Sequence, residues 1–151
     1  MKCVHLTSSV LAAGLLFALA GASAAADAPQ VVTFVERAIT DAVTDIGEKG
    51  DSNGDLLTFA NDLFDAGNAN KVGTDQGFCV RVAKGIAWEC LWTNSLADGQ
   101  ITVQGPFLDK GDSTLAITGG TGAYAGARGQ MKLHPRNPEG SMFDFTFEIL
   151  K

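Results

Sequence analysis

The segment from Val31 to Ile149 is divided into short runs of β-branched and aromatic residues, which are separated by turns rich in glycine. About eight such runs follow one another at regular spacing, and no long stretch has the 3.6-residue period of an amphipathic helix. This pattern is typical of an antiparallel barrel or sandwich. A closed barrel also leaves no exposed sheet edge. The sequence therefore predicts one all-β domain over residues 27–151.

The individual strands are placed by their composition and by the turns between them. Asp98-Gly99 is a strong signal for a hairpin turn, and Lys84-Gly85 is expected to form another two-residue turn. Residues 38–48 are expected to be extended strand or loop, because their threonine, valine and isoleucine residues are weak helix formers. The expected strands are 31–37, 56–64, 77–82, 87–93, 100–105, 113–118, 128–133 and 143–149.

The first 24 residues have the order of a secretory signal peptide. Lys2 is followed by an apolar run from Val10 to Ala20, and Ala22-Ser23-Ala24 supplies the small residues of a cleavage site. Cleavage after Ala26 fits as well. A membrane anchor is the alternative, but a span needs about 20 apolar residues and this run is shorter. We therefore expect a secreted or periplasmic protein with no membrane segment in its mature form.

Removal of the leader would change the number of charged residues and of cysteines. The whole chain has 11 basic and 17 acidic residues, and only one basic residue, Lys2, lies in the leader. An acidic chain of this kind lacks the Lys and Arg clusters that neutralise phosphates, which argues against a nucleic-acid partner. Two cysteines remain, Cys79 and Cys90. Export to an oxidising compartment makes a disulfide between them one alternative, and a role as small core residues is the other.

Strand alternation predicts what the barrel holds. With a two-residue turn at Lys84-Gly85, Cys79 lies opposite Cys90 and Arg81 lies opposite Trp88. These side chains and Trp92 share one face, while Val80, Val82 and Leu91 lie on the other. Both faces are thus partly apolar. A ligand cavity inside the barrel fits this pattern, and a filled core with an oligomer interface outside fits it equally.

The residue types that the chain contains limit the reactions that it could catalyse. His134 is the only histidine after the leader, so a histidine-based triad or a multi-histidine metal site is not expected. No phosphate-binding Gly-Lys-Ser/Thr loop is present. We expect no metal and no cofactor. Any reaction would depend on carboxylates, amides, hydroxyls, thiols or the shape of an apolar cavity.

Several segments resemble plant allene oxide cyclase, in collinear order over roughly residues 50–150. The most specific are Gly-Asp-Leu-Leu-Thr-Phe-Ala-Asn at 54–61 and Gly-Phe-Cys-Val at 77–80. Residues 99–108, 115–133 and 145–147 continue the likeness. Dirigent proteins are similar at the Gly-Gly-Thr-Gly segment, 119–122. The resemblance implies an eight-stranded antiparallel closed β-barrel, a homotrimer, and an apolar lumen in which an unsaturated epoxide is cyclised without a cofactor.

The resemblance also implies roles for single residues. Asn61 matches the asparagine that helps to hold a water on the epoxide oxygen, although it could equally satisfy buried backbone groups. Glu36 is the nearest match to the glutamate that stabilises developing positive charge; an alternative register puts that position on Thr33. Burial in an apolar lumen would raise the pKa of Glu36; the alternatives are that Glu36 pairs with Arg37 or Arg81, or faces solvent. The expected ligand-binding residues are Leu57, Phe59, Cys79, Trp88, Trp92 and Phe107.

Two features depart from the family pattern. Phe107 stands where the family has a lumen tyrosine, and residues 38–47 hold no counterpart of its Ser-Pro pair. Two hypotheses follow. In the first, the protein is a cofactor-free isomerase or cyclase that holds a lipid-like or polyketide-like chain in a reactive fold. In the second, it is a dirigent-like barrel that binds a small apolar or phenolic molecule without catalysis; fold alone cannot separate the two. A purely structural exported barrel is a third alternative.

Overall fold

The computed structural model describes residues 28–150. The expected signal peptide, residues 1–24, and both candidate cleavage sites lie outside the described residues. Within that range every element is a β-strand, and none of the described segments is a helix long and apolar enough to cross a membrane. The strands are β1 (Gln30–Arg37), β2 (Ala42–Thr44), β3 (Leu56–Asp65), β4 (Lys71–Ala83), β5 (Ala87–Leu96), β6 (Gly99–Leu108), β7 (Ser113–Gly122), β8 (Arg128–Pro135) and β9 (Met142–Leu150).

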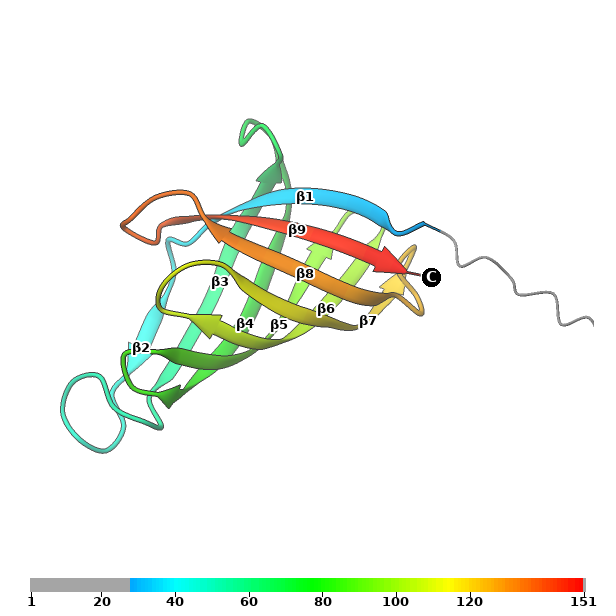
Figure 1. Ribbon diagram of the computed structural model, residues 1–151. Helices are drawn as coiled ribbons and strands as arrows, with labels where there is room; N and C mark the ends of the chain where they lie inside the picture. Colours follow the sequence, from blue (N-terminus) through cyan, green and yellow to red (C-terminus); the bar gives the residue numbers. More distant parts are fainter. Residues whose placement is uncertain (1–27, 151) are drawn as a thin grey trace, which may run out of the picture.

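Eight of these strands form a closed antiparallel barrel, as predicted (Figure 1). Neighbours follow the order β1-β9-β8-β7-β6-β5-β4-β3, and a further pairing of β1 with β3 closes the ring. The closure places Val35 opposite Phe64 and Glu36 opposite Leu63. The Arg37 guanidinium lies 3.6 Å from the centre of the Phe64 ring, which adds a cation–π contact at the seam. The short β2 pairs with the first residues of β3 and is not part of the ring.

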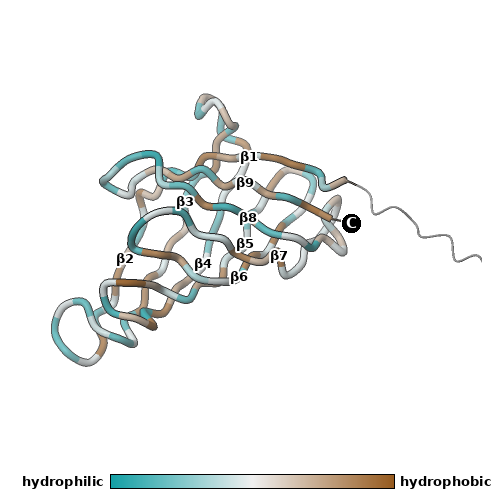
Figure 2. Tube along the Cα trace, in the orientation of Figure 1, coloured by the Kyte–Doolittle hydropathy of each residue, from teal (hydrophilic) through white to brown (hydrophobic). Residues whose placement is uncertain are grey.

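The core lies inside the barrel and follows the two-residue alternation of the strands. β9 shows it most clearly: Phe143, Phe145, Phe147 and Ile149 are buried and alternate with partly exposed polar residues. Polar and apolar segments alternate in the same way along β8 and β9 in Figure 2. Because each strand contributes every second residue, the interior is filled by side chains from all sides of the ring.

The β4–β5 hairpin has the predicted register: Cys79 lies opposite Cys90, and Arg81 lies opposite Trp88. The turn itself differs from the prediction. Ala83 pairs with Ala87, so the connection has three residues instead of two, and a bulge between Arg81 and Ala83 absorbs the extra residue. β4 also begins six residues earlier than expected, at Lys71, because it stays paired with both β3 and β5.

The glycine-rich segment 119–122 has a composition typical of a bend, but it is the end of β7 and pairs with β6. A Cβ atom on Gly120 would lie 2.6 Å from the carbonyl oxygen of Gln100. The backbones therefore approach too closely for a side chain. The turn follows the strand instead, where the amide of Ala123 donates to the carbonyl oxygen of Asp98.

Candidate functional site

A cavity lies at the end of the barrel where β1, β6 and β8 end and β3 and β9 begin. Its empty volume is about 330 Å³ out to the mouth, and the centre of a water molecule fits into about 30 Å³ of it. Because the 330 Å³ includes open solvent at the mouth, the 30 Å³ is the figure to compare with known sites, and it is far below the roughly 300–1,000 Å³ of a small-molecule site. The aromatic side chains therefore hold the lumen narrow. The lining consists of Glu36, Asp41, Leu57, Phe59, Cys79, Cys90, Trp92, Phe107, Leu133, Phe143 and Phe145.

The cavity wall is mostly aromatic. Trp92 makes an edge contact with Phe59 and a tilted one with Phe145, with ring centres 5.9 and 5.6 Å apart. Phe107 packs edge-on against Phe143. Such pairs interlock, so a larger ligand requires these rings to move together. Trp92 has a further property: its indole N–H is buried and finds no acceptor among the described residues, which leaves a donor at the wall.

Glu36 is the main polar group of the cavity. It faces inward near the end of β1 and is 5% exposed. Burial raises its pKa well above the ordinary value for a glutamate, and the negative charge of Asp75 raises it further. Thr33 lies on the outer face instead, where its hydroxyl is bonded to that of Thr146. Of the two registers that the sequence allowed, the structure therefore has Glu36 at the lumen.

Asn61 holds Glu36 and the segment after β1 in place. Its side-chain amide donates to Oε1 of Glu36 over 2.9 Å and to Oδ1 of Asp41 over 2.8 Å. Its carbonyl oxygen accepts from the amides of Ile39 and Thr40 and from the Thr40 hydroxyl. Asn61 thus satisfies backbone groups and also orients the acid at the cavity; it does not itself line the cavity.

Asp75 is a second buried carboxyl group beside Glu36 and is not among the residues predicted from the sequence. It lies opposite Asn61 on β4 and is 0% exposed. Burial raises its pKa to about 7. Neither of its oxygens has a well-aligned N–H or O–H donor within residues 28–150. The signal that could have found it is alternation, because Asp75, Gly77, Cys79 and Arg81 share one face of β4.

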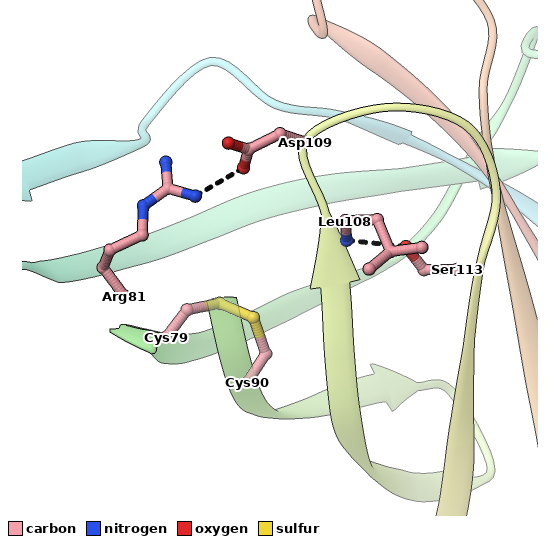
Figure 3. The surroundings of a disulfide bond; sticks show 6 residues. All are labelled: Cys79, Arg81, Cys90, Leu108, Asp109 and Ser113. Carbon is pink, nitrogen blue, oxygen red and sulfur yellow. Dashed lines mark hydrogen bonds and ion pairs between the residues drawn. A yellow bond between two sulfur atoms is a disulfide. The ribbon is translucent and has the colours of Figure 1, made fainter. Parts of the chain in front are cut away.

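Cys79 and Cys90 are joined by a disulfide, with their Cα atoms 4.0 Å apart (Figure 3). Both are 1% exposed and line the cavity. In the bonded state Cys79 has no free thiol. Of the two alternatives left open by the sequence, the structure has the disulfide, which forms a polarisable patch of the lumen wall beside the aromatic rings.

Trp88 does not line this cavity, although it was expected to bind ligand. Its ring lies 4.0 Å below the Arg81 guanidinium, and both line a separate hollow near the loop after β2. Arg81 is held there by Asp109, at 2.5 Å (Figure 3), and by Asp51. Trp88 is outside the cavity because it is four residues from Trp92 on the same strand. It therefore lies farther along the barrel axis.

Other residues of the cavity were not singled out from the sequence. Asp41 comes from the loop after β1, and Leu133, Phe143 and Phe145 come from β8 and β9. These strands meet the cavity only because the barrel closes. The expected residues Leu57, Phe59, Trp92 and Phe107 do line it, together with both cysteines and Glu36.

The arrangement suits a ligand with an apolar body and one polar centre. An aromatic and aliphatic wall surrounds the body, and one end presents an oriented acid whose pKa is raised by burial. Such a group can donate a hydrogen bond or a proton. None of the described side chains forms a group of three His, Cys, Asp or Glu residues suited to hold a metal ion.

Comparisons with known proteins agree with this architecture. The family model described as allene oxide cyclase matches residues 30–147. Among solved structures, a pyocyanin demethylase is similar at 26% identity and a TM-score of 0.66, covering 77% of this chain and 98% of its own.

Two further structures are similar in fold at 14% identity and a TM-score of 0.65. The pterocarpan synthase dirigent protein PsPTS1 is matched over 83% of this chain and 99% of its own. The exo-specific intermolecular Diels-Alderase AbnU is matched over 82% of this chain and 98% of its own. The same barrel thus occurs in proteins with different names and reactions.

Proposed function

The chain belongs to the allene oxide cyclase family, and from that premise we propose that it is a cofactor-free isomerase that folds and cyclises an unsaturated, lipid-like or polyketide-like substrate in its lumen. The observation that carries the proposal is the pairing of Glu36, a buried acid with a raised pKa, with an otherwise apolar cavity. An acid in such a place is suited to act on the one polar centre of an apolar chain.

Each part of the site has a task in this reaction. The narrow aromatic wall holds the chain in a folded conformation, which brings the reacting carbons together and lowers the entropy cost of ring closure. Glu36 donates a hydrogen bond to the epoxide or carbonyl oxygen as negative charge develops there. Asn61 fixes the position of Glu36 through a 2.9 Å hydrogen bond. The proton stays on the enzyme or returns to it, so no external acid is consumed.

The test is the stereochemistry of ring closure. An allene oxide generated in the assay closes spontaneously to a racemic cyclopentenone, and the wild-type protein is expected to yield an excess of one enantiomer. Glu36→Gln should lose most of that excess, and Asn61→Ala should reduce it. Glu89→Gln, on the outer face of β5, is the matched control and should behave as wild type. A racemic product with the wild-type protein would reject this substrate.

A second candidate function is non-enzymatic binding of a small apolar or phenolic molecule. The observation that favours it is Phe107, which lines the cavity without the hydroxyl of the family's tyrosine. Native mass spectrometry with a lipid and phenolic library separates the candidates. A retained ligand with no turnover supports binding alone, whereas absence of any retained ligand argues against both.

We propose in addition that the mature protein is exported and trimeric. Export is supported by the leader sequence and by a buried disulfide, which is typical of oxidising compartments. Trimer formation is supported by an apolar outer face on β4 and β5, where Phe78, Val82 and Leu91 are exposed. Mass spectrometry of the purified native protein should find an N-terminus at Ala25 or Asp27; a chain that begins at Met1 would contradict export.

A further inference from the structure

The carboxyl group of Asp75 is buried without a counter-charge. It lies in the barrel interior between Asn61 on β3 and Asn94 on β5, which are its partners in the two ladders. No Lys, Arg or His nitrogen of the described chain lies within 4.0 Å of Asp75 or of Glu36. A charged carboxylate in such a place is costly unless it is paired or hydrogen-bonded.

Few of the neighbouring groups can stabilise the charge of Asp75. The amide group of Asn61 uses both of its hydrogens on Glu36 and Asp41, and Asn94 donates to the carbonyl oxygen of Ile101. The Glu36 carboxyl is close enough that a hydrogen bond between the two acids, although not well aligned, is the main influence favouring the charged form of Asp75, and the backbone amides of Asp75 and Asn61 add to it. Two carboxyl groups can share such a bond only when one of them carries a proton.

The shared proton belongs on Glu36. Burial and the Asp75 charge both favour the neutral form of Glu36. Asp41, in the loop after β1, is the third acidic group and adds negative potential. β3 contributes Asn61 and β5 contributes Asn94, neither of which is charged, and β9 contributes the phenyl rings of Phe143 and Phe145. Every charge that faces Glu36 is thus negative.

We propose that Asp75 is a positioning residue that keeps a proton on Glu36: the proton is shared with Asp75 in the empty site and turns to the ligand when one binds, so that the polar end of the lumen acts as a neutral hydrogen-bond donor inside a negative field. The site then selects a ligand with an uncharged acceptor, such as an epoxide or carbonyl oxygen, on an apolar body. A carboxylate end group is repelled and must point away from Glu36. The statement about the ligand rests on the proposed function, whereas the statement about the proton does not.

The proton can be observed without any substrate. The chain has five glutamates, Glu36, Glu48, Glu89, Glu139 and Glu148, so selective 13C labelling of the glutamate carboxyl carbon gives a simple spectrum. We expect one signal to titrate well above the others and to be absent in Glu36→Gln. In Asp75→Asn that signal should move down by about one pH unit or more, because the neighbouring charge is lost. Asp62→Asn, on the outer face of β3, is the matched control and should leave it in place.

Three results would overturn the proposal: no glutamate that titrates high, a high-titrating glutamate other than Glu36, or a Glu36 titration that is unchanged in Asp75→Asn. If Asp75→Asn does not fold, Asp75→Ser removes the same charge with a smaller side chain and has the same expected result. The ligand statement is tested with 2-decanone and decanoate. Binding of the ketone alone supports it, and equal or preferred binding of decanoate contradicts it. Loss of cyclase activity with an unchanged titration would reject the proposed function but not the role of Asp75.

Discussion

At the scale of single residues, Asn61 connects the site to the rest of the fold. Five hydrogen bonds converge on its side chain, three to the carbonyl oxygen and two from the amide group. The side chain is 1% exposed, so water cannot replace these bonds without entering the barrel. Asn61 thus fixes both the position of the loop after β1 and the orientation of the Glu36 carboxyl group.

Asn61→Ala should therefore destabilise the protein by about 3 kcal/mol, because it leaves buried donors and acceptors without partners. The measurement is urea denaturation monitored by tryptophan fluorescence. Asn70→Ala is the control, because Asn70 is exposed and bonds only to Asp65 in its own loop. An equal effect of both substitutions would argue against a structural role for Asn61.

The buried acids also predict how stability depends on pH. The folded protein holds protons on Glu36 and Asp75 that the unfolded chain releases near pH 4, and the pKa of Asp75 is about 7. Between those values the folded state binds more protons than the unfolded state, so the free energy of unfolding falls as pH rises. The pKa of Asp65 is lowered mainly by a hydrogen bond from the Ala69 amide, and that of Glu148 mainly by one from the Lys132 ammonium. These two groups therefore affect the free energy of unfolding only at lower pH.

We expect maximum stability in mild acid and a decline from about pH 5 to pH 7. Asp75→Asn should flatten that decline and should melt above wild type at pH 8, because it removes an unpaired buried charge. Thermal melts across this range provide the measurement. A melting temperature that rises from pH 5 to pH 8 in the wild type would contradict the assignment.

At the scale of elements, the β4–β5 hairpin carries most of the special features. It holds the disulfide, the Trp92 ring and the bulge, and it supplies part of the cavity wall. The disulfide closes a loop across the hairpin with a sequence separation of 11. It limits the freedom of the unfolded chain, while the backbone ladder independently holds the register.

The double substitution Cys79→Ala and Cys90→Ala should keep the fold but lower the free energy of unfolding by about 3 kcal/mol, the value expected for a loop of this size. Denaturation with the same fluorescence readout measures it. Wild-type protein unfolded in the presence of a reductant should lose stability by a similar amount. No loss in either experiment would mean that the bond does not constrain the unfolded chain.

Gly77 makes room for the ring of Trp92 opposite it. A Cβ atom at Gly77 would lie 2.3 Å from the Cβ of Trp92 and 2.4 Å from the carbonyl oxygen of Leu91. Both neighbours are fixed close to the backbone, so neither can move away cheaply. The absence of a side chain on β4 is thus a condition for the aromatic wall on β5.

Gly77→Ala should cost about 1–3 kcal/mol, as expected for overpacking, and should shift the tryptophan emission because Trp92 is displaced. Gly119→Ala is the matched control on β7, since a Cβ there meets nothing within 4 Å. It should be tolerated without a spectral change. Equal behaviour of the two variants would contradict the close packing at Gly77.

At the scale of the whole molecule, the closed ring leaves the outer surface as the place for assembly. Phe78 is 46% and Val82 is 53% exposed on the outer face of β4, and Leu91 lies opposite Phe78 on β5. Adjacent apolar side chains on an outer face often mark an interface. This face is separate from the cavity, so assembly and ligand binding can be tested independently.

If the proposed trimer forms through this face, Phe78→Asp should dissociate it to monomers at micromolar concentrations. Sedimentation equilibrium measures the change. Thr114→Asp introduces the same charge on the exposed face of β7 and should leave the assembly intact. A monomeric wild-type protein would reject the trimer, and dissociation by both variants would place the interface elsewhere.

Local pattern in the sequence was enough to predict the all-β class, the strand sequence and the Cys79–Cys90 and Arg81–Trp88 register. These depend on alternation and on turns, which act between residues close in the chain. The sequence also pointed to Leu57, Phe59 and Trp92, which face the same lumen because each lies on an inward position of its strand.

Only the tertiary structure brought Glu36, Asn61 and Asp75 together and put Trp88 in a different hollow. Which inward residues share one layer depends on the tilt and stagger of eight strands and on the pairing of β1 with β3. Those quantities are properties of the closed ring, because a residue's height along the axis is set by strands far away in sequence. The chain thus determines which side chains point inward, and barrel closure determines which of them meet.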